Sequence, residues 1–267
     1  MLKKILLFIA VFTVIASNSA QAKMRCVVLD VGEGQAVLLQ RDEYAVLIDT
    51  GHFGKSYPLL SALEKYGVKT LEKVMLTHLH PDHASGIFTV MYHFPDTKIY
   101  ESGHRVDLQP STDSIRWVAE QLDTGQWDVK KVIQGSFLEW RGVKIDVLWP
   151  QIIAGDSLNR MSLVININYG LKNILLMSDA DTYVEEQLMK NNSLPGNIEL
   201  LVVGHHGAID ATSEKFLDEL SPQAAVISVN KENIRGYPHR TVVERINSRK
   251  IPLHITARDG DFAIVLE

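Results

Sequence analysis

Apolar and polar positions alternate along the chain in short blocks whose period changes from strand-like to helix-like twice. Short runs rich in β-branched and apolar residues begin at Met24 and lead into segments with helical spacing, and a second series of the same kind begins at Val129. Turn residues, such as the glycines within 32–34, separate the runs. In the first series the expected strands are 24–31, 36–40, 44–48, 71–76 and 98–101, and the expected helices are 57–66, 84–94 and 114–122.

The second series repeats the succession of strands and then helices. This order predicts two β-sheets packed face to face with helices on the outside, rather than a regularly alternating parallel sheet. The expected strands are 129–133, 137–140, 143–149, 163–168, 173–176, 200–203, 224–229, 253–256 and 262–266, and the expected helices are 181–190, 213–220 and 241–247.

The N-terminal segment has the pattern of a secretory signal peptide. Lys3 and Lys4 precede an apolar run at 5–15, and the small residues up to Ala22 form an Ala-x-Ala cleavage site. An uncleaved membrane anchor is the alternative, but a span needs about 20 apolar residues. We therefore expect a signal peptide at 1–22 and a single domain at 23–267, in a periplasmic or secreted protein without stable membrane insertion.

Composition and charge exclude few functions. The chain is 46% hydrophobic and 22% charged, which allows a normal core and does not suggest disorder. A formal net charge of -5 argues against a strongly basic surface that would hold nucleic acid by neutralising many phosphates. A metal site adds local positive charge that this sum omits, so a nucleic-acid contact stays open.

Four potential metal ligands fall within the six residues from His78 to His83. His78 and His80 are two positions apart at the end of a predicted strand, where extended backbone directs both side chains to the same side. One metal could therefore take both imidazoles. Asp82 and His83 follow a proline and begin a helix, from which they can face a second ion. Imidazole and carboxylate ligands suit zinc, and also manganese or iron.

A site for two metals needs further ligands from distant segments. Asp179 ends an apolar strand, which would aim its carboxylate into a cleft where it could bridge two cations. A helix N-cap is the other reading of Asp179, although Asp181 is better placed for that. His205 and His206 follow the strand predicted at 200–203. We expect one of them to bind metal and the other to contact substrate or the ligands, and the sequence leaves open which.

Five more residues are weaker candidates for the same site. Asn159, Ser162, Tyr237 and His239 could contact substrate oxygens, while a turn residue is the alternative for Asn159 and a surface aromatic for Tyr237. Asp49 follows a predicted strand and could support the metal ligands through hydrogen bonds, although a plain turn role is equally consistent with its position.

The run from Thr77 to His83 resembles the hallmark of the metallo-β-lactamase fold. Further motifs occur in the order found in the soluble domain of ComEC-type competence proteins and its free-standing relatives, so the chain resembles that family over nearly all of its mature length. The resemblance implies an α/β (α+β) fold, a four-layer αββα sandwich. These motifs are Leu29-Asp30-Val31-Gly32-Glu33-Gly34-Gln35-Ala36, Leu47-Ile48-Asp49-Thr50-Gly51, Asn159-Arg160-Met161-Ser162-Leu163-Val164, Ser178-Asp179-Ala180, Gly204-His205-His206-Gly207 and Tyr237-Pro238-His239.

The resemblance also implies a centre with two divalent metal ions, for which we expect zinc, with manganese as the alternative. Within it, one metal would be held by His78 and His80, and the other by Asp82 and His83. Asp179 would bridge the two metals, and a histidine of the pair His205-His206 would complete the set.

This sequence departs from the family pattern at several positions. Relatives often carry Asp where Gln35 stands, Gly where Ser178 stands and His where Tyr237 stands. No histidine between Asp82 and Asp179 matches the third ligand of other branches. These departures leave the expected metal ligands in place and therefore bear mainly on the substrate. The relatives include proposed nucleases and phosphodiesterases.

Together these residues predict an exported metal-dependent hydrolase. A hydroxide formed from a metal-bound water would attack phosphorus or a carbonyl carbon, and Asp82, His206 or His239 would move the proton. Our first hypothesis is hydrolysis of a small or polymeric phosphodiester, such as nucleic acid or a phosphorylated envelope component. The alternatives are a lactam, thioester or ester hydrolase, and a metal- or substrate-binding protein without turnover.

Overall fold

The protein is described by a computed structural model over residues 23–32, 34–105, 113–151, 157–232 and 234–267. The predicted signal peptide at 1–22 lies outside these residues, as does the middle of the turn predicted at 32–34. None of the helices in the described ranges combines the length and the apolar character needed to cross a bilayer.

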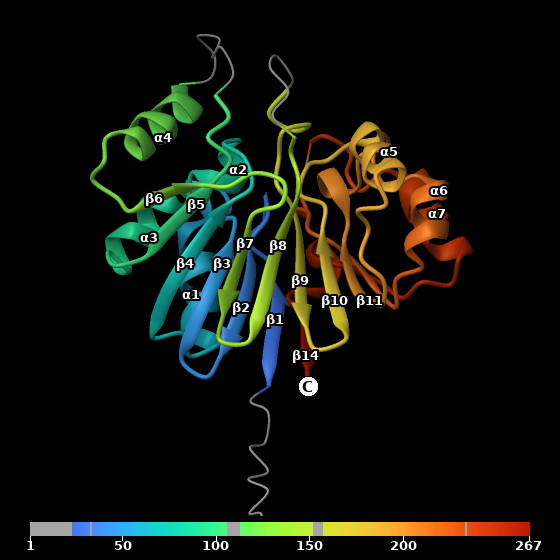
Figure 1. Ribbon diagram of the computed structural model, residues 1–267, viewed down its shortest axis with the longest axis horizontal. Coiled ribbons are helices and arrows are strands. Elements are labelled where there is room, and N and C mark those ends of the chain that lie inside the picture. The colour runs from blue at the N-terminus through green and yellow to red at the C-terminus, as the bar shows by residue number, and fades with distance from the viewer. Residues whose placement is uncertain (1–22, 33, 106–112, 152–156, 233) are drawn as a thin grey trace, which may run out of the picture.

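Two mixed β-sheets of seven strands each form the centre of the molecule (Figure 1). The first sheet has the strand order β14-β1-β2-β3-β4-β5-β6, and the second has the order β13-β12-β11-β10-β9-β8-β7. The strands of the first sheet are β1 (Met24–Val28), β2 (Val37–Arg41), β3 (Tyr44–Ile48), β4 (Thr70–Leu76), β5 (Lys98–Glu101), β6 (Val129–Lys131) and β14 (Phe262–Leu266). Those of the second are β7 (Phe137–Trp140), β8 (Val143–Trp149), β9 (Val164–Tyr169), β10 (Lys172–Leu176), β11 (Ile198–Val202), β12 (Ala225–Ile227) and β13 (Leu253–Ile255).

Helices cover the outer face of each sheet, and three apolar cores separate the four layers (Figure 1). One core, which includes Cys26 and Ile165, lies between the sheets, and the other two lie beneath the helices. This arrangement confirms the predicted αββα sandwich. The first sheet carries α1 (Ser56–Lys65), α2 (Pro81–Ala84), α3 (Ile87–His93) and α4 (Asp113–Asp123), and the second carries α5 (Thr182–Lys190), α6 (Glu214–Leu220) and α7 (Arg240–Ser248).

The structure corrects several predicted boundaries. The single helix expected at 84–94 is wrong, because α2 and α3 are separate helices around Ser85 and Gly86. Strand β1 ends at Val28 rather than at residue 31. The strand expected at 253–256 gives way at its last residue to the short helix α8 (Thr256–Asp259). Two 3-10 turns, η1 (Phe53–Lys55) and η3 (Gly204–Gly207), were not predicted.

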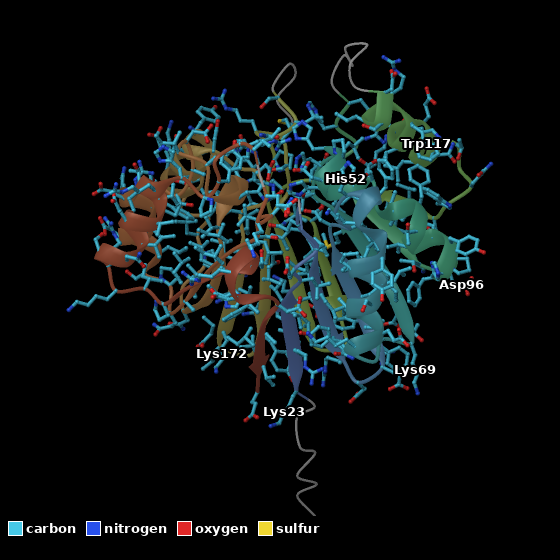
Figure 2. All side chains as sticks on the ribbon, turned by 180° about the vertical axis from the view of Figure 1, so that it is seen from behind. Lys23, His52, Lys69, Asp96, Trp117 and Lys172 are labelled. Carbon is cyan, nitrogen blue, oxygen red and sulfur yellow. The ribbon has the colours of Figure 1, made fainter. Side chains whose placement is uncertain are left out.

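Parallel pairing brings the ends of strands from both sheets to one edge of the sandwich. Strand β3 is parallel to β4, and β10 is parallel to β11, which is parallel to β12. Side chains that follow these strands therefore meet at the same edge. Figure 2 shows His52 at this end of the molecule and Lys69 and Lys172, which lie at the starts of β4 and β10, at the opposite end.

Two contacts link segments that are far apart in the sequence. The last strand, β14, pairs antiparallel with β1, and in this register Cys26 lies opposite Ile264. Across the sheets, the indole of Trp140 on β7 donates a hydrogen bond of 2.6 Å to Glu72 on β4. The two halves of the chain are thus joined at the edge of one sheet and across the sandwich.

Candidate metal centre

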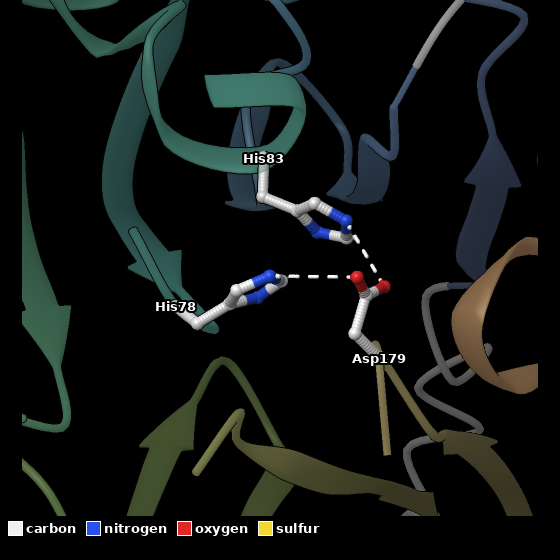
Figure 3. Close-up of side chains that lie close together, drawn as sticks. All are labelled: His78, His83 and Asp179. Atoms are coloured by element: carbon white, nitrogen blue, oxygen red, sulfur yellow. Dashed lines mark ion pairs between the residues drawn. The ribbon is translucent and has the colours of Figure 1, made fainter. Parts of the chain in front are cut away.

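Two histidines and one aspartate converge from the two sheets onto one buried point (Figure 3). His78 follows β4, His83 belongs to α2 and Asp179 follows β10. The Nε2 atom of His78 lies 3.5 Å from Oδ2 of Asp179, and Nε2 of His83 lies 3.1 Å from Oδ1. All three side chains are nearly inaccessible to solvent, so their polar atoms must find partners among themselves or in a bound ion.

His206 joins a second group with Asp82 and His83. Its Nε2 atom lies 3.2 Å from Nε2 of His83, 3.6 Å from Asp82 and 3.5 Å from Asp179. Turn η3 makes this possible, since both His205 and His206 have left-handed backbone, with φ of 46° and 53°. Such conformations cost of order 1–3 kcal/mol each and cluster at functional sites.

The outer nitrogens of the histidines are occupied by hydrogen-bond acceptors. Nδ1 of His83 lies 2.7 Å from Oδ2 of Asp49, and Nδ1 of His206 lies 2.8 Å from the carbonyl oxygen of Ser228. Nδ1 of His78 lies 3.1 Å from the hydroxyl of Thr77. In the neutral form of each ring the proton therefore belongs on Nδ1, which directs the Nε2 lone pair at the centre.

Asp49 is the hub of this supporting network. Its Oδ2 accepts from the Thr77 hydroxyl at 2.8 Å and from Gln35 at 3.1 Å, and its Oδ1 accepts from the backbone of Thr77 at 2.8 Å. The hydroxyl of Ser178 donates in turn to that of Thr77 at 2.7 Å. Because Thr77 follows β4 of the first sheet and Ser178 follows β10 of the second, these hydrogen bonds link the two sides of the centre.

The residues present fit divalent cations. With Nδ1 protonated, lone pairs of three Nε2 atoms face a carboxylate, and Oδ1 of Asp179 is buried without a hydrogen-bond donor in the described residues. The distances from 3.1 to 3.6 Å between these atoms match the separation of about 3.3 Å between ligands 2.0–2.1 Å from one tetrahedral ion. A cation between them would turn the repulsion of these lone pairs into coordination.

The buried carboxylates and imidazoles shift one another's pKa values. Burial raises the pKa of Asp179, but the charges of His83, His206 and His78 outweigh it and hold this pKa well below the usual value. Burial lowers the pKa of His83, yet the carboxylates of Asp179 and Asp49 raise it well above the usual value. Metal binding therefore competes with a proton at His83, as expected for a site whose ligands must be deprotonated.

His80 lies beside His78, as the spacing of the two histidines predicts. Its Nδ1 atom is 3.0 Å from Nε2 of His78. Burial, with a smaller effect of the nearby His78, lowers the pKa of His80 to about 4. The ring is therefore neutral near pH 7 and can offer a lone pair to the cation that His78 would bind.

His205 points to different partners from its neighbour. Its Nε2 atom lies 3.1 Å from the amide nitrogen of Asn159 and 4.0 Å from Asp179, and its Nδ1 lies 3.4 Å from Asp210. Of the pair left open by the sequence, His206 is thus the one whose ring faces the other ligands. Asn159 lies at the edge of the centre, and its Oδ1 atom is buried without a hydrogen-bond partner in the described residues.

The remaining candidates lie at different distances from the ligands. The Tyr237 ring lies 5.6 Å from that of His205 and 6.5 Å from that of His206, measured between centroids. Ser162 is fully buried. His239 caps α7, where its Nδ1 accepts from the backbone of Thr241 at 3.3 Å. In the described residues, His239 makes no hydrogen bond or ion pair with the other candidates.

A sequence profile described as the metallo-beta-lactamase superfamily matches residues 29–229. The chain belongs to this superfamily. The match includes both groups of residues that could hold a metal ion, although the identity of the metal does not follow from it.

Similar proteins place this superfamily member beside competence proteins. Recombination protein 2 of Haemophilus influenzae is 29% identical over 241 residues, which are 88% of this chain and 28% of that protein. Competence protein ComA of Neisseria gonorrhoeae is 30% identical over 87% of this chain and 31% of that protein. The chain thus spans about a third of the length of these relatives. The metallo-beta-lactamase fold protein YhfI from Bacillus subtilis shares the fold, with a TM-score of 0.61, 14% identity and coverage of 92% of this chain and 100% of that one.

Sequence reasoning missed several residues of this metallo-beta-lactamase centre. Thr77 directly precedes the histidine run, and its hydroxyl could have been noticed as a partner for a ring nitrogen. Ser228 contributes only a backbone oxygen to His206, which no side-chain pattern reveals. Arg235 lies in an exposed loop, yet its Nη1 atom is 3.6 Å from Oδ2 of Asp82. It places a cation at the mouth of the centre.

Proposed function

We propose that this superfamily member is an exported hydrolase of phosphodiesters with two metal ions, zinc or manganese, in its centre. The observation that supports it most is the convergence of three Nε2 atoms and two carboxylates on one buried point. Arg235 at the mouth favours an anionic substrate, because guanidinium groups bind phosphate oxygens in a fixed geometry. Two of the similar proteins are named for recombination and competence, which is consistent with nucleic acid as the polymer.

In this proposal the residues of the centre hold two metal ions that activate a water molecule. Bound metal ions supply the positive charge that makes a water nucleophilic near neutral pH and that neutralises oxygens in the transition state. The carboxylate of Asp179 faces His78 through Oδ2 and both His83 and His206 through Oδ1, so it would be in position to hold either ion. His78 and His80 would hold one ion, and Asp82, His83 and His206 the other.

Proton movement and substrate orientation would fall to groups at the mouth. Asp82 faces Arg235, so its carboxylate lies where a substrate phosphate would meet the site and can accept a proton there. Arg235 would orient the phosphate. The histidine rings stay fixed during this because their Nδ1 atoms remain bonded to Asp49, Thr77 and Ser228.

Hydrolysis of bis-p-nitrophenyl phosphate tests this function directly. The protein is stripped with a chelator and reloaded with zinc or manganese, and we expect activity to depend on the added metal. Asp179→Asn should lower both metal content and kcat/KM. Loss of a group that only supports a metal ligand typically costs about 10–100-fold, and we expect the loss in kcat/KM to be larger than that. Asp181→Asn is the matched control, because Asp181 caps α5 and asparagine caps a helix equally well.

The same preparations are assayed with nitrocefin and a thioester. Turnover of these carbonyl substrates without turnover of the diester would show a lactam or thioester hydrolase instead. Tight metal binding with no turnover of any of them would indicate a binding protein.

A further inference from the structure

A groove beside the metal centre is lined by residues that the centre itself does not use. Val229, Asn230 and Tyr237 line a narrow crevice next to Asp82 and His206. The same three residues also line a larger hollow of about 410 Å³, which is open to solvent. Cavities of about 300–1,000 Å³ are typical of ligand sites. A ligand at the metal centre can therefore extend past Tyr237 into this neighbouring groove.

The lining of the groove combines an apolar wall with positive charge. Pro238, Ile255 and the ring of Tyr237 supply apolar and aromatic surface, and Lys231 and Arg258 supply the cations. Proteins that bind single-stranded nucleic acid use the same combination, in which bases lie on aromatic or apolar side chains and cations follow the backbone.

Lys231 is the cation best placed to meet a ligand. The guanidinium of Arg258 is neutralised by Asp259, with nitrogen–oxygen distances of 2.7 and 2.6 Å. Lys231 is exposed, and within the described part of the chain it forms no ion pair. An anionic group in the groove would therefore gain most from contact with Lys231.

We propose that this groove binds the nucleotide next to the scissile linkage of a single-stranded nucleic acid. Its base and sugar would lie against Tyr237, Pro238 and Ile255, and its phosphate would contact Lys231. The inference rests on the proposed phosphodiester hydrolysis and adds that an oligomer is preferred to an isolated diester. A polyol phosphate would offer the same anion but no flat group for the apolar wall.

Fluorescence anisotropy with a labelled oligothymidylate that carries phosphorothioate linkages measures binding separately from turnover. Lys231→Ala should weaken binding about fivefold, the effect of one exposed charge contact of roughly 1 kcal/mol. It should also reduce the slope of log affinity against log salt by about 0.7, the value for one phosphate of a single strand. Lys231→Arg should restore both.

Lys69→Ala is the matched control, because Lys69 is an exposed lysine at the opposite end of the sandwich (Figure 2). An unchanged affinity of Lys231→Ala, or an equal loss in Lys69→Ala, would overturn the subsite. Binding of a poly(glycerol phosphate) as tightly as oligothymidylate, with the same dependence on Lys231, would overturn the assignment to a nucleotide.

Kinetics separate this inference from the function on which it rests. Lys231→Ala should raise KM for the unmodified oligothymidylate about fivefold and so reduce its advantage over bis-p-nitrophenyl phosphate. Hydrolysis of both substrates with no effect of Lys231 would reject the subsite and keep the function. Binding that depends on Lys231 without hydrolysis of any diester would reject the function and keep the subsite.

Discussion

At the scale of single residues, the centre depends on groups that would never touch a metal. Asp49 adopts left-handed backbone, with φ of 59°, and its carboxylate gathers donors from Gln35, Thr77 and His83. An acceptor in this position fixes the ring of His83 and keeps its proton on Nδ1. The shape of the centre is therefore set partly by Asp49, which does not face the centre itself but hydrogen-bonds to the ring of His83, which does.

Asp49→Asn tests this role with little change in size. Asparagine also tolerates left-handed backbone, but its NH2 group would face at least one of the hydrogen-bond donors. We expect metal affinity to fall about 10–100-fold, as when other groups that orient metal ligands are lost. Competition titration with a chromophoric chelator measures this affinity.

The control for this substitution is Asp96→Asn, since Asp96 is exposed (Figure 2). If Asp49→Asn and the unchanged protein bind metal with equal affinity, Asp49 only shapes the turn. Its position in the sequence is equally consistent with that role.

The types and spacing of residues in the sequence predicted which side chains gather at the centre better than they predicted how those side chains are oriented. His78, His83 and Asp179 could be found because ligand-type side chains follow apolar strands, and the ends of such strands meet at one edge. The choice between His205 and His206 could not be made, because it depends on two consecutive left-handed residues that propensity does not predict. The prediction that His239 takes part in catalysis remains untested.

At the scale of elements, alternation of apolar residues located most strands, while contacts from elsewhere decided where the helices break. The periodicity of 84–94 is helical throughout, so it predicted one helix. The break arises because the backbone at Gly86 packs against Thr50 and donates to Gly51 at 3.0 Å. These contacts also position α2, whose residue His83 accepts from Thr50 at 2.7 Å through its carbonyl oxygen.

Gly86→Ala should therefore disturb α2 and the ligands on it. A Cβ atom at this position would lie 2.2 Å from the carbonyl oxygen of Thr50, so one of the two backbones must move. We expect a loss of unfolding free energy of about 1–3 kcal/mol, as for other overpacked sites. Urea denaturation measures this loss.

Gly196→Ala is the matched control, because nothing lies within 4 Å of a Cβ atom there. If both variants lose the same stability, the close approach to Thr50 does not explain the position of α2, and the effect comes from replacing glycine alone.

At the scale of the whole molecule, the two sheets bury Cys26 on β1 so completely that its thiol reports on the opening of the sandwich. Cys26 lies in the core between the sheets, and burial raises the pKa of its thiol to about 12. At pH 8 the thiol is therefore protonated and shielded, so it should not react with Ellman's reagent until the protein unfolds.

Removal of residues 262–267 should expose the thiol, because Ile264 pairs with Cys26 and packs against the same core. We expect the shortened chain to react within minutes, while the intact chain reacts only in denaturant. Absorbance at 412 nm follows the reaction. Immediate labelling of the intact native protein would contradict the burial of this strand.

The pairing of β1 with β14 has a consequence for the order of events during synthesis. Strand β1 cannot gain its outer neighbour β14 until residues 262–266 have left the ribosome. Until then the backbone donors and acceptors on the outer side of β1 have no partner strand. A nascent chain of this kind completes its first sheet only after β14 has been made, and until then it remains accessible to proteins that bind unfolded polypeptide.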